Sequence, residues 1–322
     1  MKSDAKILVI GDAMLDKHTR GAVNRISPEA PVPVIDAGAK SDFSLGAAAN
    51  VACQIREAGF QVVFAYKEYE DLDGENTHET LELQCLERDI RPFPLFFPSV
   101  RHPVTTKERI WAESQQICRV DREDKRKPIP EIEEKWIGAV RGLLALAKAD
   151  GHPFAGVVFS DYDKGTLTDK FIQAIADYCH ANDIFTILDP KRYSFFGLQH
   201  LTVIKPNDRE IALTNMESGD CSQELGNTIL LNTRGKNGMT AYQRGAIIGH
   251  ERAYTLPEDV VDVCGCGDTV TAFMAMGMAS KWTLARCMHV ASLAAAVNIK
   301  HNGCYVLDAE EIQSVFSLPM TP

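Results

Sequence analysis

The sequence predicts an α/β fold in which a mostly parallel central sheet is covered by helices on both faces. Short apolar runs alternate with helix-like segments along the chain, and several of these runs end in a polar or charged residue. Continuous apolar runs are typical of strands that are buried on both faces of a parallel sheet. The alternation itself favours three layers, with the sheet between two layers of helices.

The first elements show this rhythm. Residues 6–11 form an apolar run that ends in Gly11 and Asp12, which predicts a buried strand followed by a turn. Residues 46–55 are rich in alanine and predict the start of a helix, and Gly59 fits its end. Residues 61–66 predict the next strand, so the chain begins with a strand–helix–strand unit.

The same rhythm returns in the second half of the chain. We predict strands at 155–161, 184–190, 202–207 and 228–235, and a helix at 169–181. Ligands on open parallel sheets bind at the carboxyl ends of the strands. The polar residues at those ends are Asp12, Asp161, Asp189, Asn207 and Arg234. A ligand site is therefore expected along that edge of the sheet.

Two segments do not follow the pattern. Residues 19–37 contain three prolines, which rule out a helix and disfavour a central strand. Residues 101–121 contain two short strand-like runs, 105–110 and 116–120, that are expected to pair antiparallel. Together these segments predict a small β lid over the strand ends, at about 18–38 and 100–122. With no repeat and no clear linker, residues 1–322 are expected to form one domain.

Composition and charge exclude several classes of function. The chain has 322 residues, of which 45% are hydrophobic and 24% charged, and its net charge is −10. That charge argues against a general binder of nucleic acid or of anionic membranes, which needs a basic surface. The nine cysteines are scattered, which favours reduced thiols over a disulfide framework. No apolar run approaches the roughly 20 residues of a membrane span, and we expect a cytoplasmic protein.

The strongest chemical signal is the segment 262–273, in which two glycines precede Asp268 at the start of a helix-like run. Glycine allows close approach to a ligand, and the N-terminus of a helix attracts anions. An aspartate there would repel a phosphate if it only bound it, but it suits a base that takes a proton from an attacking hydroxyl. A plain turn with Asp268 as helix cap explains the local residues equally well.

Three motifs together resemble the ribokinase-like (PfkB) carbohydrate kinases. Gly265-Cys266-Gly267-Asp268 resembles the family's GAGD signature, with Cys266 in place of alanine. Residues 46–52 resemble its GGAAxNxA signature, with Ala47 in place of the second glycine. The run 207–210 matches its NxxE motif. The resemblance covers essentially the whole chain and implies a ribokinase-like three-layer sandwich.

A narrower resemblance concerns the substrate. The runs that are similar to the heptose 7-phosphate kinases are 11–16, 25–34, 107–109, 115–116, 119–121, 189–191 and 233–239. This implies ATP-dependent phosphorylation of D-glycero-D-manno-heptose 7-phosphate at C1, giving the 1,7-bisphosphate, a precursor of ADP-heptose and lipopolysaccharide. In many relatives the kinase is fused to an adenylyltransferase, and we expect the free-standing kinase here.

The family also implies roles at the nucleotide end. Asp268 would deprotonate the sugar hydroxyl, and the backbone of residues 265–267 would stabilise charge on the transferring phosphoryl group. Asn207 and Glu210 would order Mg²⁺ and its waters beside ATP; for Glu210 the alternative is an acid at a helix start. The remaining expected cofactor-binding residues are Asp208, Arg209, Thr233, Arg234, Gly235 and Gly238.

At the sugar end, the expected substrate-binding residues are Asp12, Asp16, Gly46, Ala47 and Asn50, and Asp16 is favoured over Asp12 because it matches the family's sugar-binding aspartate. Ala47 in place of glycine bears on the fit of the substrate, since alanine is tolerated at a helix start if its φ is negative. A phosphorylated sugar also needs a cationic clamp, for which the candidates are Arg109, Arg119 and Lys191. Each of the three is equally explained as a surface charge.

Other interpretations stay open. The chain could be another PfkB kinase that acts on fructose, ribose or a nucleoside, or a silent sugar-phosphate sensor, because Ala47 and Cys266 depart from the family pattern. A helix N-terminus at Cys266 would lower the pKa of its thiol, which leads to the hypothesis of a reactive cysteine. Apolar positions in the lid, such as Val32 and Ile117, predict a homodimer through the lid.

Overall fold

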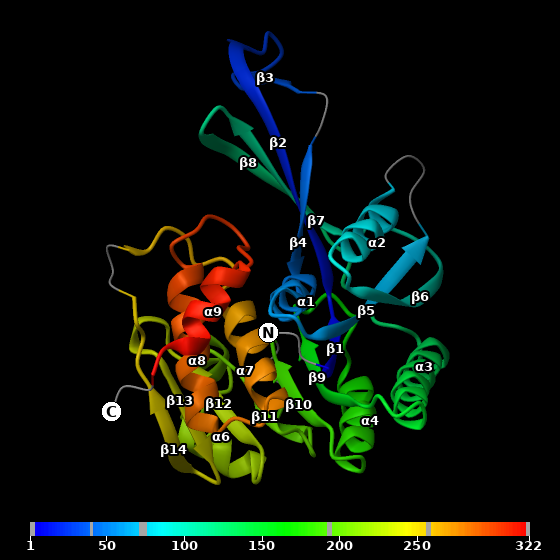
Figure 1. Ribbon diagram of the computed structural model, residues 1–322. Helices are drawn as coiled ribbons and strands as arrows, with labels where there is room; N and C mark the ends of the chain where they lie inside the picture. The colour runs from blue at the N-terminus through cyan, green and yellow to red at the C-terminus, as the bar shows by residue number, and fades with distance from the viewer. Residues whose placement is uncertain (1–3, 39–40, 71–75, 192–194, 256–258, 320–322) are drawn as a thin grey trace.

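The computed structural model describes residues 4–38, 41–70, 76–191, 195–255 and 259–319. Figure 1 shows a body built on one large sheet, from which a second, small sheet projects. Within these residues, no helix has both the length and the apolar character that a membrane crossing requires. The α/β fold with a mostly parallel sheet, which the sequence predicts, is confirmed.

The large sheet contains nine strands in the described ranges. Their order across the sheet is β14 (Ala246–Glu251), β13 (Met239–Gln243), β12 (Ile229–Thr233), β11 (Val203–Ile204), β10 (Phe185–Asp189), β9 (Phe154–Ser160), β1 (Lys6–Gly11), β5 (Gln61–Glu70) and β6 (Arg91–Arg101). Neighbouring strands from β12 to β6 run parallel. Only β13 and β14 are added antiparallel, at one edge.

The small sheet is the lid. Its strands lie in the order β3 (Pro33–Ala37), β2 (Ala13–Ile26), β7 (Thr105–Ala112) and β8 (Gln115–Arg122), and β4 (Asp42–Ala47) also pairs with β2. The antiparallel pairing expected between the two strands of 101–121 is confirmed. The lid is wider than expected, since β2 starts at Ala13 directly after the turn that follows β1. The helix predicted from residue 46 begins only at Ala48, because Gly46 and Ala47 still pair with β2.

Helices cover both faces of the large sheet. One face carries α1 (Ala48–Glu57), α2 (Thr77–Glu87), α7 (Cys266–Ala279), α8 (Leu284–Asn298) and α9 (Ala309–Ser317). The other face carries α3 (Pro130–Ala149), α4 (Asp169–His180), α5 (Asp208–Ala212) and α6 (Ser218–Leu225). Short 3-10 turns lie at Phe195–Gly197 and Gly235–Asn237.

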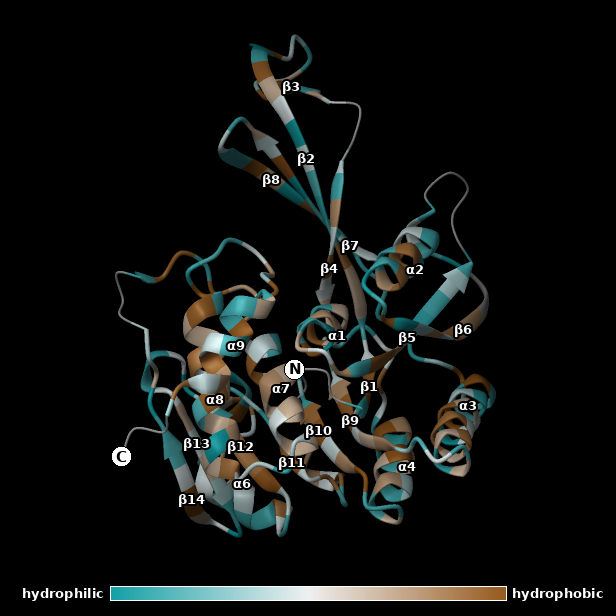
Figure 2. Ribbon diagram, viewed as in Figure 1, coloured by the Kyte–Doolittle hydropathy of each residue, from teal (hydrophilic) through white to brown (hydrophobic). Residues whose placement is uncertain are grey.

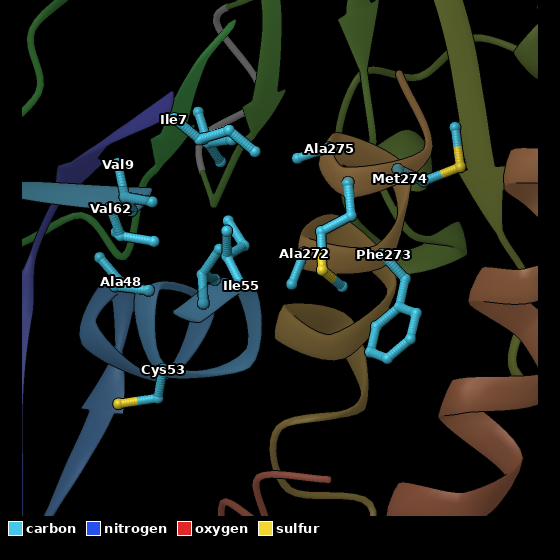
Figure 3. Close-up of a cluster of buried hydrophobic side chains, with 14 of the residues drawn as sticks. Ile7, Val9, Ala48, Cys53, Ile55, Val62, Ala272, Phe273, Met274 and Ala275 are labelled. Atoms are coloured by element: carbon cyan, nitrogen blue, oxygen red, sulfur yellow. The ribbon is translucent and has the colours of Figure 1, made fainter. Parts of the chain in front are cut away.

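Alternation along β1 explains the two cores. Ile7 and Val9 belong to the cluster under α1 and α7, whereas Leu8 and Ile10 belong to the cluster under α3 and α4. Successive side chains of a strand point to opposite faces, so a wholly apolar strand fills both cores. Figure 3 shows the first cluster, in which Ile7 and Val9 face Ile55 of α1. In Figure 2, by contrast, apolar and hydrophilic residues alternate along the lid strands.

The order of the strands locates a ligand site. After β1 the chain adds β5 and β6 on one side of it, and β9 to β12 on the other side. The direction therefore reverses between β1 and β9, and ligands bind at such a switch point, beyond the carboxyl ends of the strands. Those ends are followed by Asp12 and by Asp161-Tyr162. Figure 1 shows that the lid rises from this edge of the sheet.

Candidate active site

The N-terminus of α7 lies at the switch point. Gly265 is its N-cap and has φ 75°, in the left-handed region that glycine tolerates. A Cβ at this position would lie 3.0 Å from Asn50 Nδ2 and 3.3 Å from Cys304 Cα, so a side chain would not fit without movement. Asp268 stands in the first turn, and no side chain caps this helix end. The interpretation of Asp268 as a helix cap is therefore wrong.

The carboxylate of Asp268 is buried and held on both oxygens. Oδ2 accepts a hydrogen bond from Asn50 Nδ2 at 3.0 Å. Oδ1 accepts a short hydrogen bond from the hydroxyl of Tyr162. Burial raises the pKa of Asp268 to about 6, and the hydrogen bonds from Tyr162 and Asn50 limit that rise. The group is thus ionised at neutral pH and is a stronger base than an exposed aspartate.

A second carboxylate lies beside this one. Asp189, at the end of β10, is buried and forms an ion pair with Lys205, whose Nζ lies 3.1 Å from its Oδ2. Thr271 of α7 also donates its hydroxyl to Oδ2 at 2.9 Å. Lys205 Nζ would be 3.7 Å from a Cβ at Gly267, so this cation lies against the first turn of α7. The N-terminus of α7 and the Lys205 ammonium group together form a region that attracts anions.

Sequence reasoning missed three of these residues. Tyr162, Lys205 and Thr271 received no role, although Tyr162 directly follows a predicted strand and Lys205 lies near the end of another. The available signal was their position at the carboxyl edge of the sheet. What the sequence could not show is that Tyr162, in the loop after β9, donates its hydroxyl to Asp268, 106 positions further along the chain.

The expected metal-binding pair forms a capping box at the start of α5. Asn207 Oδ1 accepts the backbone N–H of Glu210 at 2.9 Å, and Glu210 Oε2 accepts that of Asn207 at 2.8 Å. Glu210 is buried, not solvated, and its other oxygen lies 3.3 Å from Lys191 Nζ. The motif therefore has both expected features: it caps the start of α5, and it presents a buried carboxylate to the site.

The predicted nucleotide residues gather around β12. Asn207 forms an isolated parallel bridge with Thr233, so the start of α5 and the end of β12 adjoin. Asp208 Oδ1 lies 3.5 Å from Arg234 Nε, while Arg209 is exposed on α5. Gly235 has φ 52° and Gly238 has φ 75°, and the turn between them closes through a bond from Arg234 N to Gly238 O at 2.8 Å.

A nucleotide with Mg²⁺ fits this donor set. In the described ranges, no three His, Cys, Asp or Glu side chains come together as a metal cluster. Mg²⁺ keeps several waters and is commonly held by one or two carboxylates together with substrate phosphates, so a complete protein cage is not required. Glu210 is the buried carboxylate beside Asn207, and the first turn of α7 offers backbone N–H groups to phosphate.

On the lid side, Asp16 and Arg109 form a close ion pair. Arg109 Nη1 lies 2.5 Å from Asp16 Oδ1. A Cβ at Gly46 would lie 2.6 Å from Asp16 Oδ2, so glycine makes room for this carboxylate. After burial itself, the charges of Asp16 and then Asp268 are the causes that raise the pKa of the Cys304 thiol. The charges of both carboxylates therefore act on this thiol.

The fold constrains two of the predicted sugar-binding residues. Ala47 has φ 54° and ψ −129°, a conformation that favours glycine, because β4 must turn sharply into α1 there. Asp12 is buried, and its carboxylate accepts backbone N–H groups of Tyr162, Lys164 and Thr166 at 2.8 to 3.1 Å. Asp12 holds the loop after β9 in place and is occupied by it. Asn50 Oδ1, in contrast, is buried and has no hydrogen-bond partner in the part of the chain that is described.

The three candidate cations for the phosphate clamp lie in different surroundings. Only Arg109 lies beside the predicted sugar residue Asp16. Arg119 is bound to Asp121 on its own strand, with Nε 2.7 Å from Oδ1, and its side chain is 47% exposed. Lys191 lies by Glu210, with Nζ 5.3 Å from the centre of the Tyr162 ring, and therefore stands beside the predicted Mg²⁺ residues.

The hypothesis of a reactive Cys266 is contradicted. Burial raises the pKa of the Cys266 thiol to about 11, and the charges of Asp262 and Asp268 act in the same direction. The thiol donates to Asn298 Oδ1 at 3.3 Å. Desolvation and two carboxylates outweigh the positive end of the helix here. Cys266 remains a protonated, hydrogen-bonded side chain at neutral pH.

Comparisons with known proteins agree with this geometry. The model of the family described as pfkB family carbohydrate kinase matches residues 143–311, more than half of the chain. The bifunctional protein HldE of Azorhizobium caulinodans is 32% identical over 327 residues, covering 96% of this chain and 64% of the relative. That of Pelobacter propionicus is 32% identical over 328 residues, covering 98% and 64%. The chain thus spans about 64% of the length of these relatives.

Solved structures show the same fold. Phosphofructokinase-2 from Escherichia coli, in complex with substrates and products, matches with a TM-score of 0.70 at 16% identity, covering 97% of this chain and 98% of that one. Ribokinase from Arabidopsis thaliana, complexed with ribose and ATP, matches with a TM-score of 0.66 at 17% identity, covering 99% and 100%. The fold and the family match together show that the chain belongs to the PfkB family of carbohydrate kinases and is a sugar kinase.

Proposed function

We propose that the chain transfers the γ-phosphoryl group of ATP to the C1 hydroxyl of D-glycero-D-manno-heptose 7-phosphate. The product would be the 1,7-bisphosphate, on the way to ADP-heptose and lipopolysaccharide. The observation that carries the proposal is a buried base together with a lid arginine beside the predicted sugar-binding aspartate. Asp268 lies at the N-terminus of α7, Arg109 is paired with Asp16, and the charges of both aspartates act on the Cys304 thiol.

The lid face that carries Asp16 presents cations beside carboxylates. Directly opposite pairs in the register place Asp16 beside Lys107, His18 beside Arg109 and Arg20 beside Trp111 on adjacent strands β2 and β7. Arg20 lies over the Trp111 ring, 5.7 Å from its centre, and His18 stacks on the same ring. Arg20, Lys107 and Arg109 on this face favour a sugar that carries a phosphate at its far end.

The residues then divide the work. Asp16 accepts sugar hydroxyls, Arg109 contacts the sugar phosphate, and the free amide oxygen of Asn50 accepts a further hydroxyl. Asp268 takes the proton of the reacting hydroxyl as it attacks. The first-turn N–H groups of α7 and Lys205 stabilise the negative charge that moves to the transferring group.

The nucleotide end is formed by α5 and β12. ATP with Mg²⁺ supplies the phosphoryl group and partly neutralises its charge. Glu210 and Asn207 order the hydrated cation, and residues 233–238 line the nucleotide. Lys191, placed beside Glu210, contacts phosphate from the side of the base.

All nine cysteines are free thiols. Free thiols are typical of proteins in the reducing cytoplasm, where ATP is available.

Phosphoryl transfer to a panel of acceptors tests this function. The panel contains heptose 7-phosphate, fructose, fructose 6-phosphate, ribose and a nucleoside, each with ATP and Mg²⁺. We expect the highest kcat/KM with heptose 7-phosphate, and NMR should locate the new phosphate on C1. Turnover of ribose or fructose with no reaction of heptose 7-phosphate would replace this substrate by another of the same family. No turnover of any acceptor would favour a silent sugar-phosphate sensor.

We also propose that the chain forms a homodimer through the lid. Five apolar lid residues are more than a third exposed: Val23, Ile26, Val32, Ile117 and Val120. β3 and β8 are the open edges of this sheet, and exposed apolar edge strands favour pairing with another chain. Light scattering at micromolar concentration should give twice the mass of the chain. Ile117→Lys should shift the mass to that of one chain. A monomer in both the wild type and the variant would reject the dimer.

A further inference from the structure

Tyr162 connects the loop after β9 to the base. Its backbone N–H donates to Asp12 Oδ2 at 2.8 Å, and its hydroxyl donates to Asp268 Oδ1. The buried carboxylate of Asp12 also accepts the N–H groups of Lys164 and Thr166, so the loop on which Tyr162 stands is fixed at three points. The contact of Tyr162 with Asp268 is thus built into the fold of the loop.

The hydroxyl occupies a place that the reaction needs. A base can take a proton only from a hydroxyl that donates a hydrogen bond to it. Asp268 already receives one such hydroxyl, from Tyr162 on Oδ1, while the Asn50 amide holds Oδ2. Burial, followed by the charges of Asp268 and Asp189, raises the pKa of Tyr162 far above its ordinary value, so the phenol stays protonated and remains a donor. It therefore imitates an acceptor hydroxyl that cannot react.

Tyr162 is partly exposed, whereas Asp268, to which its hydroxyl donates, is buried. Lys191 lies over the ring, with its Nζ 5.3 Å from the ring centre and 3.3 Å from Glu210 Oε1. The phenol thus lies between the base and the cation–carboxylate pair of the nucleotide side. A sugar that enters from the lid and a phosphate that approaches Lys191 would both meet it.

We propose that Tyr162 is a positioning residue that occupies the place of the acceptor hydroxyl on Asp268, so that water is kept off the base until the sugar displaces the phenol. This rests on the proposed function, in which Asp268 is the base and ATP the donor. Without the phenol, water can donate to Oδ1. Its oxygen then bonds to the γ-phosphorus, the bond to the β-phosphate oxygen breaks with its electrons leaving on ADP, and the water proton passes to Asp268. The products are ADP and phosphate.

Tyr162→Phe tests the inference because it removes only the hydroxyl. Release of phosphate from ATP and Mg²⁺ without sugar should rise by about tenfold or more, the size expected when a hydrogen bond to a charged group no longer competes. The KM for the sugar phosphate should fall, since no phenol has to be displaced, while kcat stays within about threefold. Tyr305→Phe is the matched control, because its hydroxyl also donates to a carboxylate, Glu311, at 2.8 Å. It should leave both rates unchanged.

The double variant Tyr162→Phe/Asp268→Asn identifies the base in this hydrolysis. It should return phosphate release to the wild-type level. Unchanged phosphate release in Tyr162→Phe with normal sugar turnover would overturn the inference alone. So would a fall in kcat with no rise in hydrolysis, because the hydroxyl would then assist the transfer. If the wild type fails to bind ATP in a calorimetric titration, the proposed function and the inference both fall. If the acceptor is a sugar other than heptose 7-phosphate, the hydrolysis assay remains valid, because it contains no sugar.

A measurement on the wild type covers the case in which Tyr162→Phe does not fold. The eight tyrosines can be replaced by 3-fluorotyrosine and followed by fluorine NMR. The resonance that Asp268→Asn shifts should be the one that moves when the sugar phosphate binds to the wild type, as the phenol leaves the carboxylate. A resonance that responds to Asp268→Asn but stays in place on saturation with sugar would contradict displacement.

Discussion

Asn50 donates its side-chain amide to Asp268, with Nδ2 3.0 Å from Oδ2, and so joins two helices that lie 218 positions apart in the sequence. The bond fixes the carboxylate at the start of α7 from the side of α1. It leaves Oδ1, the oxygen that Tyr162 approaches, for a hydroxyl donor. The orientation of the predicted base thus depends on both signature motifs at once.

Replacing Asp268 by asparagine should remove the base and keep its shape. We expect kcat to fall by about 10²–10⁴, the usual contribution of a positioned general base. ATP affinity should stay within a few-fold, because the backbone N–H groups of α7 are unchanged. Turnover assays combined with calorimetric ATP titration check both points. Full activity in Asp268→Asn would show that another group accepts the proton.

The pH dependence follows from the raised pKa of Asp268. Burial brings that pKa to about 6, so the group is protonated, and unable to accept a proton, in acid. The value of kcat/KM should therefore be flat above pH 7 and should fall about tenfold per pH unit well below 6. ATP binding measured over the same range separates this limb from titration of the nucleotide. An acid limb near pH 4 would mean that the free carboxylate behaves as an exposed one.

Ala47 is strained in the folded protein, and relief of that strain is measurable. With φ 54° and ψ −129°, it occupies a region that glycine enters without penalty. Ala47→Gly should stabilise the protein by about 1 kcal/mol, since the strain removed exceeds the backbone entropy that glycine adds. Ala48→Gly, at the first position of α1, is the control and should destabilise by about 0.5–1 kcal/mol. Equal losses in the two variants by chemical denaturation would deny the strain.

The accessibility of thiols gives a further check. Cys118 on β8 is the one exposed cysteine of the nine, all of which are described, whereas Cys266 is partly covered and its thiol pKa is raised to about 11. Iodoacetamide at neutral pH should therefore label Cys118 first, and the activity should be retained. Peptide mass spectrometry gives the order of labelling. Early loss of activity together with modification of Cys266 would restore the reactive-thiol hypothesis.

The sequence was most informative where the local pattern decides the structure. The wholly apolar run of β1 predicted a strand buried on both faces, and its residues alternate between the two cores. The prolines of 19–37 indicated neither a helix nor a central strand, and the segment lies in the lid. The glycines around Cys266 marked the helix start, because a Cβ at Gly265 would meet Asn50 and Cys304.

Long-range contacts set the limit of such prediction. Asp12 and Asp16 look equivalent in the sequence, but three backbone N–H groups of a loop some 150 residues away occupy the first. Arg109 and Arg119 are direct partners across β7 and β8, yet only Arg109 finds Asp16. Ala47 was expected in a helix because alanine favours one, whereas pairing of β4 with β2 continues to that residue.

The Asp16–Arg109 pair should distinguish phosphorylated from plain sugars. Arg109 Nη1 lies 2.5 Å from Asp16 Oδ1. Among the described residues of the lid, Arg109 is the one cation in contact with a predicted sugar-binding residue, and its guanidinium group can donate two hydrogen bonds to a phosphate. Arg109→Met should raise the KM for the sugar phosphate by roughly 10- to 100-fold, the loss expected for charge-assisted hydrogen bonds. The KM for ATP should change little, because β12 and α5 lie apart from the lid.

Arg122→Met is the matched control for this prediction. Arg122 is also a lid arginine paired with a carboxylate, Glu108, with Nη1 3.2 Å from Oε2, but alternation along β7 puts Glu108 on the face opposite to Arg109. Its removal should leave both KM values nearly unchanged. Initial-rate kinetics on the two variants decide the matter. A similar rise of KM in both would mean that the lid responds only as a folded unit, whereas a rise confined to Arg109→Met would place the sugar phosphate on the Asp16 face.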